Sequence, residues 1–525
     1  MTNNSLSYTE EMSSIADNNK RIAKNTLLLY FRMLFSMGVS LYTSRVVLNA
    51  LGVEDYGIYN VVGGVVAMFS LISASLSSAT SRFFTFELGK NNHAELRNLF
   101  STAITIHLVL AVTVMLLAEV LGVWFLNYHL NIPTSRMPAA NWVFQCSILS
   151  FAVGVLSVPF NASIIAHERM NAFAYIGILD VVLRLCLIIC LANFPFFSDK
   201  LIVYAIMLSC VSLFMQSIYM SYCRRHFTEC RFRMSWNRSL INKMSSFAGW
   251  NFIGCSSAVL KDQGVNILLN MFCGPAVNAA RGISYSVNAA VGSFVGNFMT
   301  ALNPQITKSY ASGNYQYMES LAQWGSRFSF YILLILALPI LFETDFVLKL
   351  WLKDYPEHTA NFVRLVLVLS MVDSLSNTLI TLQLATGKIR NYQLAVGGML
   401  LMNFPVSYIF LKLGYAPEVT MVVAIVLSLA CLFLRLTFLR WMVKLSVGGY
   451  LIHVLANIVL VSACASILPC AIYAGMDDGL CRFVLLVVTG VLWTSMIVYL
   501  VGCSSGEKIF IRQQCVIVWK RFSGR

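Results

Sequence analysis

Long apolar stretches, joined by short polar connections, make up most of the chain. A helix that crosses the hydrocarbon core of a bilayer needs about 20 mostly apolar residues. Stretches of this kind begin near positions 26, 57, 99, 142, 172, 201, 245, 274, 326, 361, 391, 418, 451 and 479. The pattern therefore predicts an all-α integral membrane protein with about 14 transmembrane helices, and it leaves no room for a sizeable soluble catalytic domain.

Two segments about 220 residues apart resemble each other. Residues 48–90 and 269–313 both begin with Leu-Asn, pass through a short loop to a Gly-Ile pair at Gly57 and Gly282, and have a glycine at matching places near their ends, Gly89 and Gly313. The offset corresponds to about six spans, an even number, so both copies enter the membrane in the same direction and form a parallel repeat. Chance similarity between apolar helices is the alternative explanation.

The spans and their connections predict an order of domains. Two six-helix lobes are expected to surround a central cavity, as in alternating-access transporters, with two helices appended. The predicted parts are a cytoplasmic N-terminal segment (1–25), the N-lobe (26–222), a basic cytoplasmic linker (223–244), the C-lobe (245–443), helices 13 and 14 (444–503) and a basic cytoplasmic tail (504–525).

Composition and charge agree with a membrane protein. The chain is 58% hydrophobic and only 11% charged, whereas soluble domains carry about 25% charged residues. The formal net charge of +14 is explained by Lys and Arg in segments expected on the cytoplasmic side. Both termini are therefore predicted in the cytoplasm of a bacterium, with the chain in its inner membrane and its basic segments near anionic lipid headgroups. Nucleic-acid binding is not expected.

The sequence lacks the motifs of the enzymes that could explain it. No HExxH or Walker A sequence occurs, and the 14 cysteines do not have zinc-ligand spacing. No metal site, cofactor, catalytic residue or structural disulfide is predicted. A membrane polymerase or glycosyltransferase is the less favoured alternative, because the outer loops are short and the one Asp-Asp pair, Asp477 and Asp478, lies in an outer loop.

Charged residues inside the predicted spans are the candidate ligand contacts, because a charge in lipid is costly. Arg45, Lys261 and Arg281 have no evident partner on their own helix apart from Asp262, and are the best candidates. A guanidinium group binds phosphate bidentately, so these residues suit an anionic ligand. Further candidates for the cavity are Arg32, Asp180, Arg184, Tyr285 and Asn288.

Several of these charges also have a structural explanation. Asp180 and Arg184 are four residues apart on one helix face, so they either neutralise each other or belong to a site. Arg435 is near a cytoplasmic helix end, where its side chain can extend to the interface without a function. The polar face with Arg281 and Tyr285 is typical of a helix that lines a water-filled cavity, and close helix packing is the alternative.

Two segments resemble a known family. RVVLNALGVEDYG (residues 45–57), followed by a Gly-rich span, and GPAVNAARGIS (residues 274–284) are similar to polysaccharide flippases of the multidrug/oligosaccharidyl-lipid/polysaccharide exporter superfamily. The resemblance covers essentially the whole chain and implies a two-lobed, V-shaped transporter. Its substrate would be an undecaprenyl-pyrophosphate-linked glycan for O-antigen of lipopolysaccharide, capsule or another surface polysaccharide. Arg45 and Arg281, at matching places in the two lobes, would be among the cationic residues that hold it.

The resemblance leaves other transport functions open. A multidrug or organic cation antiporter of the same superfamily is one alternative, and a lipid II flippase is another. For the flippase function, the implied partners are the lipid bilayer, the lipid-linked glycan, and the polysaccharide polymerase with its chain-length machinery. A monomer is expected.

Overall fold

The computed structural model describes the backbone of residues 2–67, 69–129, 132–193, 199–231, 237–509 and 512. Side chains are described from residue 21 onward, apart from single helical positions, among them Arg45. Arg45, one of the predicted ligand contacts, therefore lies outside the described side chains.

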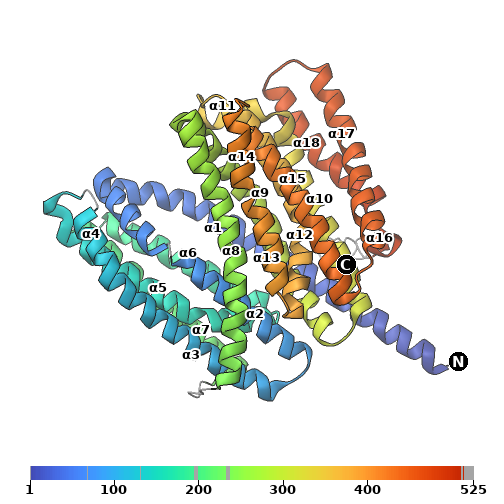
Figure 1. Ribbon diagram of the computed structural model, residues 1–525, viewed down its shortest axis with the longest axis horizontal. Helices are drawn as coiled ribbons and strands as arrows, with labels where there is room; N and C mark the ends of the chain where they lie inside the picture. Colours follow the sequence, from blue (N-terminus) through green and yellow to red (C-terminus); the bar gives the residue numbers. More distant parts are fainter. Residues whose placement is uncertain are drawn as a thin grey trace, which may run out of the picture. The chain divides into compact units, whose positions relative to one another are not determined.

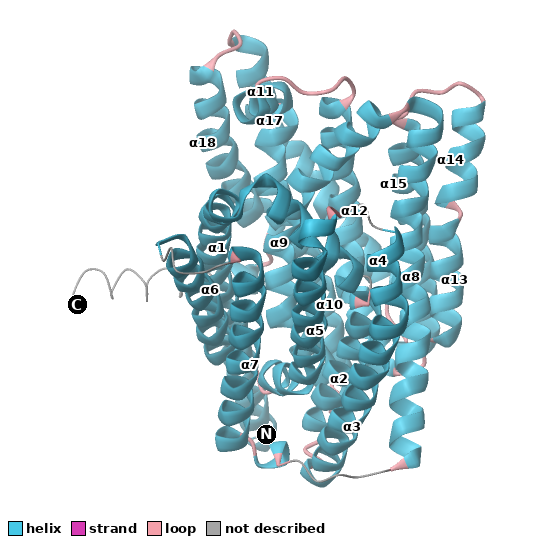
Figure 2. Ribbon diagram, turned by 90° about the vertical axis from the view of Figure 1, so that its left-hand side faces the viewer, coloured by secondary structure: helices cyan, strands magenta, loops and turns pink. Residues whose placement is uncertain are grey.

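All regular secondary structure in the described part of the chain is helical, which confirms the predicted all-α class (Figures 1 and 2). The α-helices are α1 (Thr2–Ala67), α2 (Ser70–Gly89), α3 (His93–Leu117), α4 (Val123–His129), α5 (Met137–Ala166), α6 (Met170–Asn193), α7 (Lys200–His226), α8 (Arg238–Cys273), α9 (Pro275–Ala311), α10 (Tyr315–Phe342), α11 (Thr344–Leu352), α12 (Thr359–Thr386), α13 (Arg390–Leu401), α14 (Asn403–Lys412), α15 (Val419–Val443), α16 (Val447–Tyr450), α17 (Asn457–Gly475) and α18 (Leu480–Ile497). Short π-helical segments extend α3 (Ala118–Gly122), precede α17 (Leu451–Ala456) and follow α18 (Val498–Gly502), and 3₁₀ turns occupy Thr134–Arg136 and Thr228–Cys230.

Ten helical segments of the described chain are long and apolar enough to cross a membrane. Four further spans expected from the sequence begin near positions 26, 57, 245 and 274, in α1, at the junction of α1 and α2, in α8 and in α9, and they are not among the ten. The ten segments are His93–Tyr128, Thr134–Ala166, Met170–Leu191, Lys200–His226, Tyr315–Phe342, Thr359–Thr386, Arg390–Lys412, Val419–Val443, Val447–Gly475 and Leu480–Gly502.

The chain folds into two compact units, which are described separately below. The N-terminal unit comprises residues 25–256 and 307–313, and the C-terminal unit comprises residues 257–306 and 314–525 together with 1–24. Helices α8 and α9 are therefore each divided, with one part of the helix in either unit.

The order of helices in the N-terminal unit recurs in the C-terminal unit. Helices α3, α5, α6 and α7 begin at residues 93, 137, 170 and 200, and helices α10, α12, α13 and α15 begin at residues 315, 359, 390 and 419. The packing recurs as well: α5 lies between α3 and α7, and α12 lies between α10 and α15. In the C-terminal unit, α17 and α18 pack against each other and against α10.

Two glycines reverse the chain at corresponding places. Gly52 divides the long helix α1 and has φ 81° and ψ 170°, and Gly274 separates α8 from α9 with φ 84°. Side chains with a Cβ atom rarely adopt such angles, so glycine suits both turns. Within α1, Gly52 is the residue with non-helical backbone angles.

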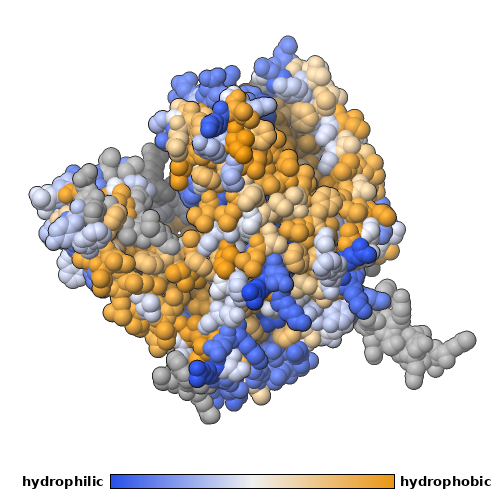
Figure 3. All heavy atoms as spheres, in the orientation of Figure 1, coloured by the Kyte–Doolittle hydropathy of each residue, from blue (hydrophilic) through white to orange (hydrophobic). Residues whose placement is uncertain are grey.

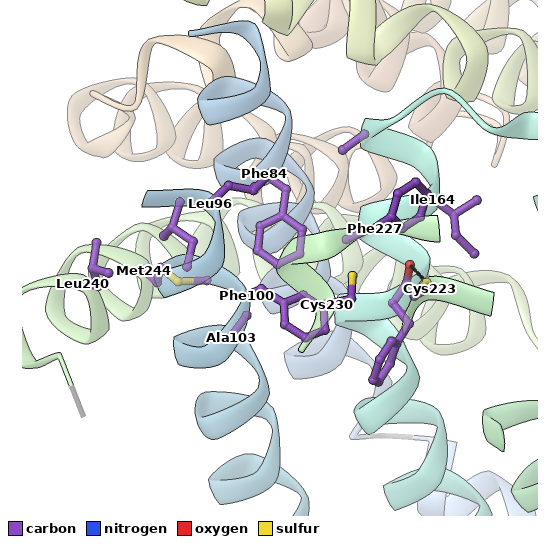
Figure 4. Close-up of a cluster of buried hydrophobic side chains, with 14 of the residues drawn as sticks. Phe84, Leu96, Phe100, Ala103, Ile164, Cys223, Phe227, Cys230, Leu240 and Met244 are labelled. Carbon is purple, nitrogen blue, oxygen red and sulfur yellow. Dashed lines mark hydrogen bonds between the residues drawn. The ribbon is translucent and has the colours of Figure 1, made fainter. Parts of the chain in front are cut away.

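A cluster of large apolar side chains fills the core of the N-terminal unit at one end of its helices. Phe84 from α2, Phe100 from α3 and Phe160 from α5 pack with ring centroids 5.5 to 6.0 Å apart. Figure 4 shows Leu96, Leu240 and other apolar side chains around Phe84 and Phe100. Together they hold α2, α3 and α5 in register with the start of α8.

The outer flanks of the helices are apolar, as expected for contact with lipid. On α3, Leu108, Val112 and Leu116 are exposed, although each is large and hydrophobic. In Figure 3, hydrophobic residues cover most of the visible helix flanks and hydrophilic residues gather at helix ends. A soluble protein would not expose so much apolar surface, so the chain is a multi-pass membrane protein.

Arg435 does not extend to the membrane interface, and that prediction was wrong. Its side chain is buried and donates hydrogen bonds to the Tyr392 hydroxyl (3.1 Å) and the Ser376 hydroxyl (3.0 Å). These partners belong to α13 and α12, so they could not be identified from the sequence around Arg435.

Candidate functional site

In the C-terminal unit, charged and polar side chains of α8 and α9 form one hydrogen-bonded cluster. Arg281 of α9 donates to the Asn266 side chain and, at 3.0 Å, to the Tyr285 hydroxyl. The Tyr285 hydroxyl in turn donates to Asp262 at 3.2 Å. Lys261 completes the cluster, with its Nζ 3.8 Å from an Asp262 oxygen. Two cations therefore surround one carboxylate.

Arg281 has more interaction partners in the structure than the sequence around it indicated. Its guanidinium lies 4.4 Å from the centre of the Tyr285 ring and 3.7 Å from Asp262. The Arg281 side chain is 4% exposed and that of Lys261 is 12%, whereas that of Asp262 is 39%. The Asp262 carboxylate is therefore the most accessible charge of this cluster, and the side chains of the two cations are more deeply buried.

The accessible part of Asp262 does not lie on the lipid-facing side of α8. Of the exposed large apolar residues of this helix, Ile253, Leu260, Ile267 and Met271 share one face, and Phe252 and Phe272 flank that face. At 3.6 residues per turn, Asp262 points away from that face. A charge in this position avoids the hydrocarbon and remains open to a polar ligand or water.

Helix α9 exposes a face without large apolar side chains. Its polar face with Arg281 and Tyr285 packs inside the unit, and Asn288 on the same face accepts a hydrogen bond from Ser370 of α12. Within the described α9, no large hydrophobic residue is exposed. The exposed positions beside the polar face are Ala279, Gly282, Ser286, Ala289 and Gly296.

The N-terminal unit holds a second group of intramembrane charges, on α1 and α6. The predicted Asp180–Arg184 pair is confirmed, with Arg184 Nε 3.1 Å and 3.0 Å from the two carboxylate oxygens. Arg32 of α1 lies over the Phe173 ring at 4.4 Å and packs against Gly177, where a Cβ would come within 2.9 Å of Arg32 Cδ. A Cβ at position 177 would therefore require the flexible Arg32 side chain to shift.

Polar links between helices add contacts that the sequence analysis missed. In the C-terminal unit, Asp373 of α12 accepts a hydrogen bond from Ser428 of α15, and Thr381 of α12 donates to Asn303 of α9 at 2.7 Å. Each partner lies more than 50 residues away along the chain, so spacing gave no signal. In the described part of the chain, no group of three or more His, Cys, Asp or Glu residues could hold a metal ion.

Arg136, which is not among the predicted site residues, links three connecting segments of the N-terminal unit by ion pairs. Arg136, just before α5, bonds to Asp55 with Nε–Oδ1 at 2.8 Å, and to Asp199 at 2.9 Å. Asp199 also caps α7, because its Oδ1 accepts from the Leu201 amide at 3.0 Å. One signal for this arrangement is visible in the sequence, namely an aspartate directly before a helix.

Comparison with known proteins gives similarity to membrane transporters. No family model matches the sequence. The uncharacterized membrane protein EpsK of Bacillus subtilis (strain 168) is 20% identical over 317 residues, which cover 58% of this chain and 60% of EpsK. The chain thus matches only about three fifths of the length of this curated relative.

Solved structures match over more of the chain. A multidrug resistance MATE family transporter of the MOP superfamily, in an outward-facing conformation, has a TM-score of 0.69 at 15% identity, covering 81% of this chain and 96% of that one. MATE in the straight conformation has a TM-score of 0.70 at 13% identity, with the same two coverages. A MOP superfamily transporter from Pyrococcus furiosus, whose description states a binding pocket of reverse polarity and a different function, has a TM-score of 0.66 at 13% identity, with coverages of 81% and 96%. The chain therefore has the transporter fold of MATE proteins of the MOP superfamily.

Proposed function

We propose that this protein is a flippase that moves an undecaprenyl-pyrophosphate-linked oligosaccharide across the bacterial inner membrane by alternating access, for the synthesis of a surface polysaccharide. The observation that carries the proposal is the cluster of Lys261 and Arg281 around Asp262, inside a MATE-like fold. Two cations against one carboxylate leave a net positive charge in the membrane. That charge favours an anionic headgroup such as pyrophosphate.

Arg281 acts in this proposal as a positioning residue. It is buried, and its hydrogen bonds to Asn266 and Tyr285 fix the side chains that border the accessible Asp262. Lys261 and the positive field of Arg281 stabilise an approaching phosphate. Arg45, in the matching segment of the first half of the chain, is proposed separately as a cationic contact for the substrate. The lipid tail stays in the bilayer while the headgroup crosses.

The proposed orientation has both termini in the cytoplasm, with the basic segments 223–244 and 504–525 on the same side. Alternating access would come from rocking of one of the two similar halves of the chain against the other, the mode expected for transporters built from repeats. A ligand drives such a cycle only if it binds the two states with different affinity. The proposed assembly is a monomer that passes its product to a polysaccharide polymerase and chain-length machinery.

Export of an organic cation is the second candidate function, and Asp262 favours it. At 39%, the Asp262 side chain is the most exposed charged member of the Lys261–Asp262–Arg281 cluster. An accessible carboxylate attracts a cation, and the nearby Asp373 of α12 is a second acid in the same unit. The two functions predict opposite effects of neutralising Asp262.

Deletion of the gene, followed by complementation, tests the proposal. Loss of a flippase should make lipid-linked oligosaccharide accumulate on the cytoplasmic leaflet and should remove surface polysaccharide. Arg281→Gln should fail to restore export although the protein is present in the membrane, whereas Asp262→Asn should retain it. Arg364→Gln is the matched control, because its ion pair with Asp345 is exposed. Altered drug sensitivity with normal surface polysaccharide would instead establish the cation exporter.

A further inference from the structure

The Asp180–Arg184 pair is unusually accessible for an ion pair in a membrane-spanning helix. The side chains of Asp180 and Arg184 are 31% and 42% exposed. The lipid-facing side of α6 is marked by exposed Tyr175, Leu179 and Cys186. At 100° per residue, Asp180 and Arg184 lie on the opposite side of the helix, so their exposed surface does not face the hydrocarbon.

The pair retains hydrogen-bonding capacity on both partners. Arg184 uses its Nε to bond the two Asp180 oxygens, and a guanidinium has four more N–H groups on its terminal nitrogens. Among the contacts found in the described part of the chain, those terminal groups donate to no other side chain. Each Asp180 oxygen likewise has a lone pair that the Arg184 Nε does not occupy. The pair therefore presents hydrogen-bond donors of Arg184 next to hydrogen-bond acceptors of Asp180.

The neighbouring groups are phenolic. The Tyr219 hydroxyl is close enough to Asp180 and Arg32 to interact with both electrostatically. Arg184 interacts in the same way with Tyr59 and Tyr204, whose ring centroids are 5.1 Å apart. Arg32, the other charge near this group, is placed one turn away from Asp180 by its packing on Phe173 and Gly177.

This arrangement selects among chemical classes of ligand. An oxyanion that approached Arg184 would also approach the Asp180 carboxylate and be repelled by it, and a cation would meet the converse repulsion from Arg184. A hydroxyl group has no such conflict, because it can accept from Arg184 and donate to Asp180. Tyrosine side chains add polar hydroxyls and ring faces suited to the apolar faces of a sugar.

We propose that Asp180 and Arg184, with Tyr219 beside them, form a subsite in the N-terminal unit that binds neutral hydroxyl groups and so recognises the saccharide part of the transported lipid. This inference rests on the proposed flippase function and deepens it. The subsite discriminates between glycosylated and unglycosylated carriers.

Binding of two probes to the purified full-length protein tests the subsite. The probes are undecaprenyl pyrophosphate and the lipid-linked oligosaccharide isolated from cells that lack the transporter. The wild-type protein should bind the oligosaccharide-bearing probe more tightly. Asp180→Asn and Arg184→Gln should each weaken binding of that probe by about 10- to 100-fold, the usual effect of losing hydrogen bonds to charged groups. Binding of undecaprenyl pyrophosphate should change by less than about 2-fold.

Arg225→Gln is the matched control for Arg184→Gln, since it removes an exposed arginine at the end of α7 and should affect neither probe. If a single variant does not fold, the reversed pair, Asp180→Arg with Arg184→Asp, keeps the ion pair and should still lose the preference for the glycosylated probe. Equal weakening of both probes, or no change in either, would overturn the subsite. A wild-type protein that binds both probes equally would overturn the subsite alone, and one that binds neither would overturn the proposed function as well.

Discussion

Glu343 and Arg482 form a two-point ion pair between the end of α10 and the start of α18. Arg482 Nε lies 2.5 Å from Glu343 Oε1, and a terminal nitrogen of the same guanidinium lies 3.1 Å from Oε2. The exposed fractions of the two side chains are 3% for Glu343 and 8% for Arg482. Near the middle of α10, Arg327 pairs with Glu507, which follows α18 in the sequence. Helix α18 is thus held to α10 by ion pairs near both ends of α18.

Replacement of Arg482 by Gln should destabilise the C-terminal unit strongly. The substitution leaves the Glu343 carboxylate buried without its cation, which costs about 3–5 kcal/mol when a buried pair loses one partner. Unfolding in detergent micelles measures the change. Arg364→Gln, which breaks an exposed pair with Asp345, is the control and should cost at most about 1 kcal/mol. Similar losses in the two variants would contradict a special role of the buried pair.

Gly52→Ala should destabilise the N-terminal unit through the backbone alone. A Cβ at Gly52 would meet nothing within 4 Å, so there is no steric clash with neighbours. The angles of φ 81° and ψ 170° nevertheless belong to a region that is essentially restricted to glycine, with a cost of about 1–3 kcal/mol for other residues. Gly57→Ala is the control, because this helical glycine also has open space around it and should be neutral or slightly stabilising. Equal effects in a micelle unfolding assay would disprove the explanation.

Glu418 should make stability depend on pH in the acid range. This residue precedes α15 outside the membrane-spanning segment. Burial alone would raise the pKa of its carboxyl, but hydrogen bonds from Asn361 (3.0 Å) and His358 (2.7 Å) lower the pKa below its ordinary value. The stabilisation is therefore complete above the unfolded-state pKa of about 4.3 and is lost as the pH falls through the lower folded-state value.

Thermal unfolding between about pH 6 and pH 3 measures this dependence. Glu418→Gln should reduce the loss of stability at low pH, whereas Glu357→Gln, at an exposed position, should leave the wild-type profile unchanged. An identical acid profile in Glu418→Gln and the wild type would show that this carboxyl does not contribute.

Arg136→Gln should loosen the start of α7. Arg136 holds Asp199, which caps that helix, and also holds Asp55. The ion pairs are partly exposed, so a loss of about 1–2 kcal/mol is expected. Amide hydrogen exchange at Leu201 and Ile202 should become faster. Arg136→Lys should give an intermediate exchange rate, because lysine keeps the charge but lacks the planar guanidinium. Unchanged exchange in both variants would show that the pairing of Arg136 with Asp199 and Asp55 does not stabilise the start of α7.

Whether the interactions of a charged residue could be predicted from the sequence depended on where its partners lie. The Asp180–Arg184 pair was predictable, because residues four apart on a helix are neighbours whatever surrounds the helix. The burial of Arg281 was not predictable, because Asn266 and Asp262 come from a different helix. The prediction for Arg435 was wrong for the same reason, since its hydrogen-bond partners lie on α12 and α13.

The sequence by itself determined the class of the protein and the course of the chain through the membrane. Hydropathy and helix length are local properties, so apolar stretches of sufficient length specify membrane-spanning helices without reference to any partner. The repeat offset of about 220 residues was visible for the same reason, and helix starts at 93 and 315 follow it. Only the tertiary structure decided which charges are accessible. The rotation of each helix about its axis depends on packing against its neighbours, and that rotation left Asp262, Asp180 and Arg184 accessible but buried Arg281.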